Sequence, residues 1–166
     1  AELLFQRREV AAHGKLLAAV VQHAQDLRLT EGAQMHEGEV SAELGLAGWP
    51  AVAEESIVAR DALLAEHVGS RVHVQHLSTA GSVEIIRWAK ERGIRVTAEA
   101  TPHHLLLTDE SARTYDPLFK VNPPLRSAAD VDALWEGVRQ GEIQTIGSDH
   151  VPRKRATKGE DLWKAS

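Results

Sequence analysis

Cysteine is absent from the 166 residues, and aromatic side chains make up only 4% of them. Without cysteine there can be no disulfide, no thiolate nucleophile and no zinc or iron–sulfur site built on sulfur. Any bound metal ion must therefore be held by the nine histidines and by carboxylates.

Long apolar runs are also missing. No stretch approaches the roughly 18 apolar residues that a transmembrane helix needs, and charged residues (Glu2, Arg7, Arg8 and Glu9) occupy the place of a signal-peptide core. With 43% apolar and 26% charged residues and a mean hydropathy of -0.28, the composition is typical of a globular domain. We expect a cytoplasmic protein without a membrane partner.

Positive charge and the common phosphate-binding motifs are scarce as well. The net charge is -5, and the only basic cluster, residues 153–158, is short, which argues against a nucleic-acid partner. Neither G-x-G-x-x-G, G-x-x-x-x-G-K nor G-x-S-x-G occurs. Nucleotide binding and serine acyl-enzyme chemistry therefore lose support.

Short β-rich runs alternate with helical patterns along the chain. The expected strands are 17–23, 71–76, 94–99 and 143–148, and the expected helices are 54–67, 82–92 and 128–140. This alternation predicts an α/β fold with a parallel sheet covered on both faces. The sheet could be open or a barrel. A complete (β/α)8 barrel takes about 250 residues, so we expect residues 1–166 to form one unit that is part of a barrel.

Each expected strand ends in a titratable group. His23 and His76 close the first two, residues 99–104 with two histidines follow the third, and Asp149 and His150 follow the fourth. The carboxyl ends of parallel strands meet at one edge, where α/β enzymes place their chemistry. Histidine with carboxylate is the ligand set of catalytic zinc, manganese or iron. The sequence therefore predicts a metal site at this edge.

The other histidines lie away from the expected strand ends. His13, His36 and His67 fall in helical or loop contexts, so we expect them to be solvated surface residues.

Several longer motifs now become informative in combination. They are Gln-His-Ala-Gln-Asp (22–26), Met-His-Glu-Gly-Glu (35–39), His-Leu-Ser-Thr-Ala-Gly-Ser (76–82), Val-Thr-Ala-Glu-Ala-Thr-Pro-His-His (96–104), Lys-Val-Asn-Pro-Pro-Leu-Arg (120–126) and Gly-Ser-Asp-His-Val-Pro (147–152). Together they resemble the dihydroorotase family of the amidohydrolase superfamily. Hydantoinases, dihydropyrimidinases and allantoinases are its near relatives, and the resemblance covers nearly the whole chain.

The resemblance implies a TIM-like (β/α)8 barrel in which residues 1–166 are the C-terminal half, approximately strands five to eight, with no second domain. It implies a binuclear metal centre, with two zinc ions as the first choice and manganese, cobalt or iron as alternatives. The implied reaction is metal-dependent hydrolysis of a cyclic amide, the interconversion of dihydroorotate and N-carbamoyl-aspartate in pyrimidine biosynthesis. The implied partners are further copies of the chain and aspartate transcarbamoylase.

Residue by residue, the resemblance assigns His23 and His76 as ligands of the more exposed metal. It assigns Asp149 as a ligand of the other metal and as the catalytic group that carries the proton from water to the leaving nitrogen. Asn122 matches a residue that orients the substrate ring. His103 and His104 match no metal ligand, and we expect them to support their loop.

Three departures from the family pattern stand out. The remaining metal ligands, a histidine pair and a bridging carboxylate or carboxylated lysine, would lie before residue 1. Gln25 stands where the family usually has glutamate. Arg153 stands where dihydroorotases usually place a histidine that binds the substrate carboxylate, and we expect Arg153 to bind that carboxylate instead. A solvated loop at Arg153 is the alternative.

Two alternatives to a dihydroorotase stay open. One is a hydantoinase, dihydropyrimidinase or allantoinase-like amidase, which Arg153 favours and which Asn122 and the 78–81 motif disfavour. The other is a non-catalytic amidohydrolase-like scaffold. Scaffolds of that kind lose metal ligands, whereas His23, His76 and Asp149 are all present.

Overall fold

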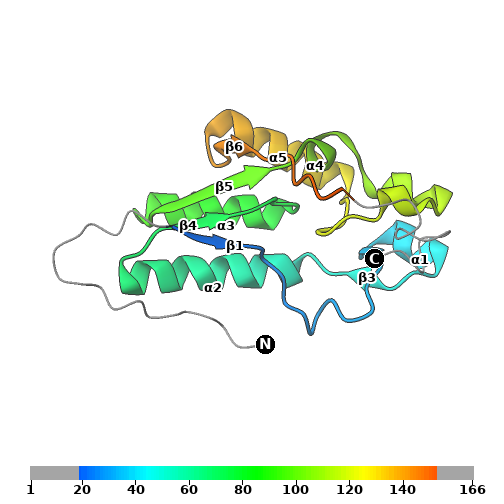
Figure 1. Ribbon diagram of the computed structural model, residues 1–166, viewed down its shortest axis with the longest axis horizontal. Helices are drawn as coiled ribbons and strands as arrows, with labels where there is room; N and C mark the ends of the chain where they lie inside the picture. The colour runs from blue at the N-terminus through cyan, green and yellow to red at the C-terminus, as the bar shows by residue number, and fades with distance from the viewer. Residues whose placement is uncertain (1–18, 153–166) are drawn as a thin grey trace.

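The computed structural model describes residues 19–152 and contains a four-stranded parallel sheet (Figure 1). Its strands follow one another in space as they do in sequence, in the order β1 (Val20–Gln22), β4 (Val72–Val74), β5 (Val96–Ala100) and β6 (Thr145–Ile146). Each strand lies inside one of the four predicted runs, except that β5 extends one residue beyond its run, to Ala100. Residues 17 and 18 of the first run lie outside the described residues.

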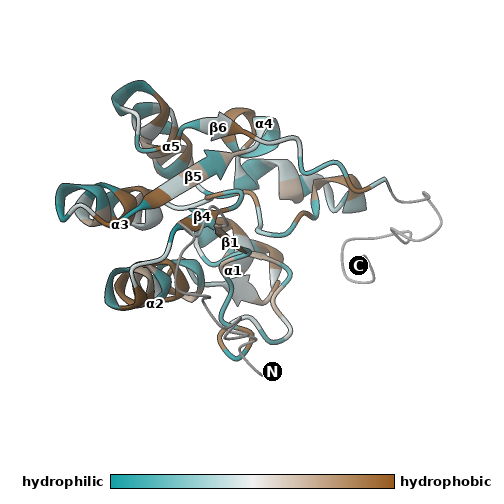
Figure 2. Cartoon of the chain, turned by 60° about the vertical axis from the view of Figure 1, so that its left-hand side comes forward, coloured by the Kyte–Doolittle hydropathy of each residue, from teal (hydrophilic) through white to brown (hydrophobic). Residues whose placement is uncertain are grey.

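Three long helices connect these strands: α2 (Val52–Val68), α3 (Ala80–Glu91) and α5 (Ala128–Gln140). The last has the predicted bounds, because Ser127 forms a capping box with Asp130 at its start and Gly141 ends it in a left-handed conformation at φ 83°. Helix α2 packs on α3 and α3 packs on α5, so all three lie on the same side of the strands (Figure 2).

The strand order selects a barrel over an open doubly wound sheet. Right-handed crossovers place every connecting helix on one face as long as the strand order never reverses, whereas a doubly wound sheet needs a reversal. The covered face is the core, formed by strand residues that alternate with exposed ones and by the apolar sides of the helices: Val72, Val74, Val96, Ala98, Ala100, Ile57, Val58, Val83, Ile86 and Leu134.

The expectation that both sheet faces are buried is wrong for the part of the chain that the structure describes. On the face away from the helices, Val21 is 56% exposed, and Thr97 is exposed too. In a barrel, this inner face is filled by side chains from strands on the opposite wall.

Smaller elements that the sequence did not predict lie in the loops after β1 and β5. The loop after β1 holds β2 (Met35–His36), α1 (Glu39–Leu44) and β3 (Gly48–Trp49), and the loop after β5 holds α4 (Pro102–Leu106), η1 (Asp109–Thr114) and η2 (Pro117–Phe119). A second apolar cluster that includes Met35, Val40 and Ala112 joins the two loops. The strands point toward this end of the molecule (Figure 1).

Among residues 19–152, no helix combines the length and the apolar character needed to span a bilayer.

Candidate functional site

His23, His76 and Asp149 follow three strands at the same edge of the sheet. His23 comes directly after β1, while His76 and Asp149 come two and three residues after β4 and β6. The backbone ladder continues almost to these side chains, since the Gln75 amide donates to the Gln22 carbonyl at 2.9 Å. The parallel sheet thus places at one edge residues that are more than 120 positions apart in the chain.

The rings of His23 and His76 are in direct contact. His23 Nδ1 lies 2.8 Å from His76 Nε2, and the rings meet edge to face at 73°. On its other side, His23 Nε2 lies 3.1 Å from Oε1 of Gln25, whose amide nitrogen donates to Thr30 Oγ1 at 2.7 Å. Because Gln25 Oε1 can only accept, His23 carries its proton on Nε2 and directs the lone pair of Nδ1 at His76.

Burial keeps His76 in its neutral form. The residue is 5% exposed, and this burial lowers the pKa of its imidazole, with His23 lowering it further and the carboxylate of Asp149 opposing both. Its second ring nitrogen, Nδ1, is buried and has no hydrogen-bond partner among the described residues. A neutral imidazole is the form that binds metal ions.

The backbone is unusual at two of the three positions. His76 has φ 34° and Asp149 has φ 45°, and among the described residues Tyr115 is the only other non-glycine with positive φ. This conformation costs free energy and persists where surrounding structure imposes it, most often at functional sites.

The pair of histidines fits a metal ion, although the described residues do not complete a site. Residues 19–152 contain no group of three or more His, Asp or Glu side chains placed to hold a metal. Two imidazole nitrogens bound to one tetrahedral zinc lie about 3.3 Å apart, so the observed 2.8 Å separation needs only a small widening. Asp149 is exposed and lies outside any such group, although its charge acts on both His76 and His103.

His104 has the supporting role expected of it. It is 2% exposed, accepts a hydrogen bond from Thr101 Oγ1 at Nδ1 (2.7 Å) and donates from Nε2 to the Pro123 carbonyl (2.9 Å). Burial, and then the neighbouring His103, lower the pKa of His104 to about 3. The bond to Pro123 ties α4 to the segment that contains Asn122, which is itself exposed.

The structure corrects one prediction and leaves another outside its range. His36, expected on the surface, lies half-buried in β2, where Nη1 of Arg126 reaches its Nδ1 at 3.2 Å and burial lowers its pKa. His67 is exposed as expected. Arg153, the predicted carboxylate-binding residue, lies outside the described residues, as does His13.

A polar group inside the barrel was not predicted. In the middle of β4, His73 Nδ1 lies 2.8 Å from Thr97 Oγ1, and its Nε2 lies 3.4 Å from Glu99 Oε2. A side chain at Gly147 would collide with the Glu99 carboxylate, because a Cβ there would lie 2.8 Å from the carboxyl carbon. The alternation His73, Gln75 within an apolar strand was the signal for an inward-facing histidine.

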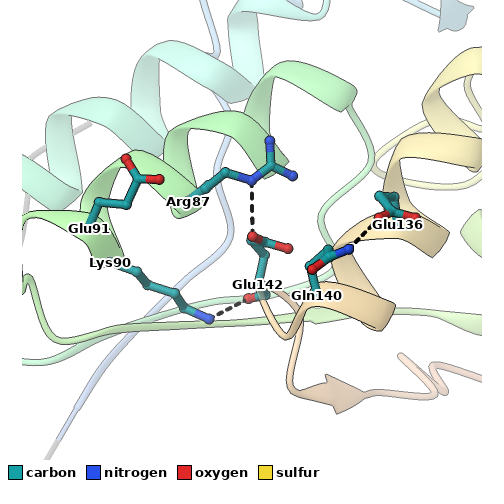
Figure 3. A pocket seen from close by; sticks show the side chains of 6 residues that line it. All are labelled: Arg87, Lys90, Glu91, Glu136, Gln140 and Glu142. Carbon is teal, nitrogen blue, oxygen red and sulfur yellow. Dashed lines mark hydrogen bonds and ion pairs between the residues drawn. The ribbon is translucent and has the colours of Figure 1, made fainter.

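A cavity of about 450 Å³ lies between α3 and α5 near their C-terminal ends, away from this edge (Figure 3). Its lining residues are paired with one another: Arg87 Nε donates to Glu142 at 3.0 Å, and Lys90 Nζ donates to the carbonyls of Gly141 and Glu142 at 2.6 and 2.9 Å. These bonds hold the C-terminal end of α5 against α3, so the polar groups around the cavity have a structural role.

Comparison with known proteins agrees with this geometry. The Dihydro-orotase-like family matches residues 5–82. The dihydroorotases of Streptomyces coelicolor and Leifsonia xyli are 70% and 62% identical over 84% and 90% of this chain, which cover 32% and 34% of those proteins. The dihydroorotase of Mycobacterium tuberculosis is 52% identical over 93% of this chain and 36% of its own length.

Solved structures resemble the fold as well. L-hydantoinase (dihydropyrimidinase) from Arthrobacter aurescens is 31% identical with a TM-score of 0.76, over 89% of this chain and 34% of that one. D-hydantoinase (dihydropyrimidinase) from Thermus sp. is 25% identical with a TM-score of 0.74 over the same shares. The chain spans about a third of the length of the relatives it matches. In both sequence and fold the chain therefore matches the dihydroorotase family and its hydantoinase relatives, and its four parallel strands correspond to part of their (β/α)8 barrel.

Proposed function

We propose that the full protein is a metal-dependent dihydroorotase, which interconverts dihydroorotate and N-carbamoyl-aspartate in pyrimidine biosynthesis. The observation that carries the proposal is the contact of His23 with His76 at the ends of neighbouring parallel strands, in a chain that is 70% identical to a dihydroorotase.

His23 and His76 are the proposed ligands of one divalent ion, and Asp149 of a second, with zinc as the proposed metal. When bound, such ions lower the pKa of water and polarise a carbonyl oxygen. Gln25 fixes the direction of His23 from behind, through the 3.1 Å contact of its Oε1 with Nε2, which is the usual work of a residue behind a metal-binding histidine.

Asp149 is the proposed proton carrier. It is the only carboxylate among the expected strand-end ligands, and its exposed position leaves its oxygens open to the substrate. It accepts a proton from the attacking water and delivers it to the leaving amide nitrogen, so that one group serves as base and then as acid. The half-buried imidazole of His103 lies within the field of this carboxylate.

Asn122 and Arg153 are the proposed substrate-binding residues. Asn122 is exposed and lies next to Pro123, whose carbonyl accepts the bond from His104, and the Asn122 amide can pair with the ring. A guanidinium at Arg153 can pair with the ring carboxylate through two parallel hydrogen bonds.

A hydantoinase-like amidase is the second candidate. The named hydantoinases among the similar structures favour it, but their identities of 25% and 31% are well below the 70% and 62% of the two dihydroorotases. We further propose that residues 1–166 supply the C-terminal half of the barrel, and that the protein is a cytoplasmic homo-oligomer with aspartate transcarbamoylase as a candidate partner.

The test is a comparison of substrates with the full-length, zinc-loaded protein. We expect ring opening of dihydroorotate to exceed that of dihydrouracil and hydantoin in kcat/KM by at least about 10²-fold, because the site pairs with a charge that the other rings lack. A preference for either uncharged ring would replace the proposal by the hydantoinase alternative. No hydrolysis of any ring, with metal bound, would favour a scaffold.

A further inference from the structure

Two charged side chains are buried between α2 and the segment that precedes α5. Glu54 is 1% exposed and Arg126 is 2% exposed, and the fully buried Ser78 lies between them. Ser78 and Arg126 belong to the 76–82 and 120–126 motifs, yet neither has a part in the proposed chemistry.

The hydrogen bonds of this group have only one possible direction. The Ser78 amide donates to Glu54 Oε1 at 3.0 Å, and the Ser78 hydroxyl bonds to Glu54 Oε2. Arg126 Nε donates to the same hydroxyl at 3.0 Å. Since arginine cannot accept and a carboxylate cannot donate, the single serine proton must point at Glu54. The Ser78 hydroxyl therefore links the two charged side chains, because it accepts from Arg126 and donates to Glu54.

The other end of Arg126 reaches the loop after β1. Its Nη1 donates to the Trp49 carbonyl at 2.7 Å and to His36 Nδ1 at 3.2 Å. Its own carbonyl accepts from the Asp109 amide at 2.9 Å. A single guanidinium thus connects the loops that follow β1, β4 and β5.

A second tie joins two of these segments. Asp130, in the first turn of α5, accepts a hydrogen bond from the Ala80 amide at 2.9 Å. It also accepts from the amide and the hydroxyl of Ser127, the N-cap residue of the same helix. The stretch that follows His76 is therefore held against the stretch that follows Asn122 at two points.

We propose that Ser78 and Arg126 are positioning residues, which hold the backbone after His76 and the segment carrying Asn122 in one fixed relation. Burying two charged side chains costs free energy that an apolar contact would not cost. A chain of directional hydrogen bonds, however, fixes the distances between the loops that it joins. His76 is two residues before Ser78, and Asn122 is four residues before Arg126, so a shift at this junction moves a proposed metal ligand relative to a proposed substrate contact. The catalytic consequence rests on the proposed function; the mechanical coupling does not.

The coupling is tested with Ser78→Ala in the full-length protein. This change removes one hydroxyl and leaves both charges in place. Ser82→Ala is the matched control, because Ser82 is also fully buried and its hydroxyl bonds to Thr79 at 2.9 Å without touching Glu54 or Arg126. We expect hydrogen exchange to become about fivefold faster in both 77–79 and 121–127, the effect of losing one ordinary hydrogen bond. In the control we expect exchange to stay unchanged in 121–127, because Ser82 contacts only Thr79 in the first segment.

The functional arm measures the zinc dissociation constant by chelator competition and kcat and KM for dihydroorotate. We expect Ser78→Ala to weaken zinc binding about tenfold, the low end for residues that support metal ligands, and to lower kcat. Arg126→Lys keeps the positive charge, but an ammonium group cannot reach Ser78 and Trp49 together as the branched guanidinium does. This variant should therefore reproduce the changes, whereas Arg87→Lys, at the opposite end of the strands, should not.

The outcomes separate the two ideas. Faster exchange in only one of the two segments, or a lower melting temperature with zinc affinity and kcat equal to those of Ser82→Ala, would overturn the positioning role. If exchange and zinc affinity change as expected but the wild type leaves dihydroorotate intact, the positioning role stands and the proposed substrate falls.

Discussion

The Nδ1 atom of His23 lies 2.8 Å from the Nε2 atom of His76, although 53 residues separate them in sequence. One ring is exposed and the other is buried. Because their lone pairs and protons face one another, the two rings need only exchange this shared hydrogen bond for a cation, with the barrel around them unchanged.

Replacing His76 by Ala should therefore release metal without unfolding the protein. We expect the zinc content to fall from about two ions per chain toward one, as measured by elemental analysis after gel filtration, with an unchanged far-ultraviolet circular dichroism spectrum. His67→Ala, which alters an exposed histidine of α2, is the control. A variant that unfolds but keeps its zinc would contradict the assignment.

Gln25→Glu should strengthen metal binding. A carboxylate that accepts the His23 Nε2 proton raises the basicity of Nδ1 more than a neutral amide does, and partners of this kind change metal affinity by about 10-fold or more. Zinc competition titrations measure the effect, with Gln34→Glu as a control in the same loop. Equal or weaker affinity would mean that Gln25 only fixes the ring through the bond to Thr30.

Asp149→Asn tests the proton carrier. Loss of a general base lowers turnover by about 10²-fold or more, and weaker metal binding adds to the loss. The measurement is kcat at saturating dihydroorotate with metal occupancy determined in parallel. Asp132→Asn, on the exposed side of α5, should be neutral. Activity within a few-fold of wild type at full occupancy would exclude the role.

Arg153→Ala tests the substrate charge. We expect binding of dihydroorotate to weaken by about 1.5 to 3 kcal/mol, the range for hydrogen bonds to charged groups, while dihydrouracil and hydantoin bind as before. Inhibition constants of the product and of the uncharged rings measure the difference, and Arg139→Ala on exposed α5 is the control. An equal effect on all rings would point to a change in loop structure.

His104 makes stability depend on pH. Burial holds its pKa near 3 in the folded protein, against about 6.5 when unfolded, so the unfolded chain binds the proton first. Its contribution is fully present above pH 6.5 and is lost as the pH falls toward 3, with a slope of up to about 1.4 kcal/mol per pH unit. Urea unfolding of wild type and His104→Gln between pH 7 and 5 should converge; parallel curves would refute this.

Periodicity predicted the large elements well because their signals are local. Helix α5 has its own cap residues at both ends, and each strand is a short apolar run between helices. The two-residue strands β2 and β3 carry no periodic signal of their own; they form because Met35 pairs with Gly48 across the loop. This tertiary pairing also buries one side of His36, which explains why its surroundings could not be predicted from its neighbours.

The meeting of His23 and His76 could be predicted because a parallel sheet brings strand ends together, a rule that needs only the strand positions. The link through Ser78 could not be found in this way. Glu54 and Arg126 are charged residues that local sequence places on the surface, and only the packing of α2 against the two loops makes them a buried pair.

Among the described residues, β1 and β6 each pair with a strand on one side only. Their free edges and the uncovered apolar side chains of Val21 and Ile146 would be accessible in a fragment limited to this stretch. Unpaired strand edges recruit other strands, so such a fragment would tend to associate with itself. Its free edges would then pair with strands of other copies, in place of the strands that complete the barrel in a longer chain.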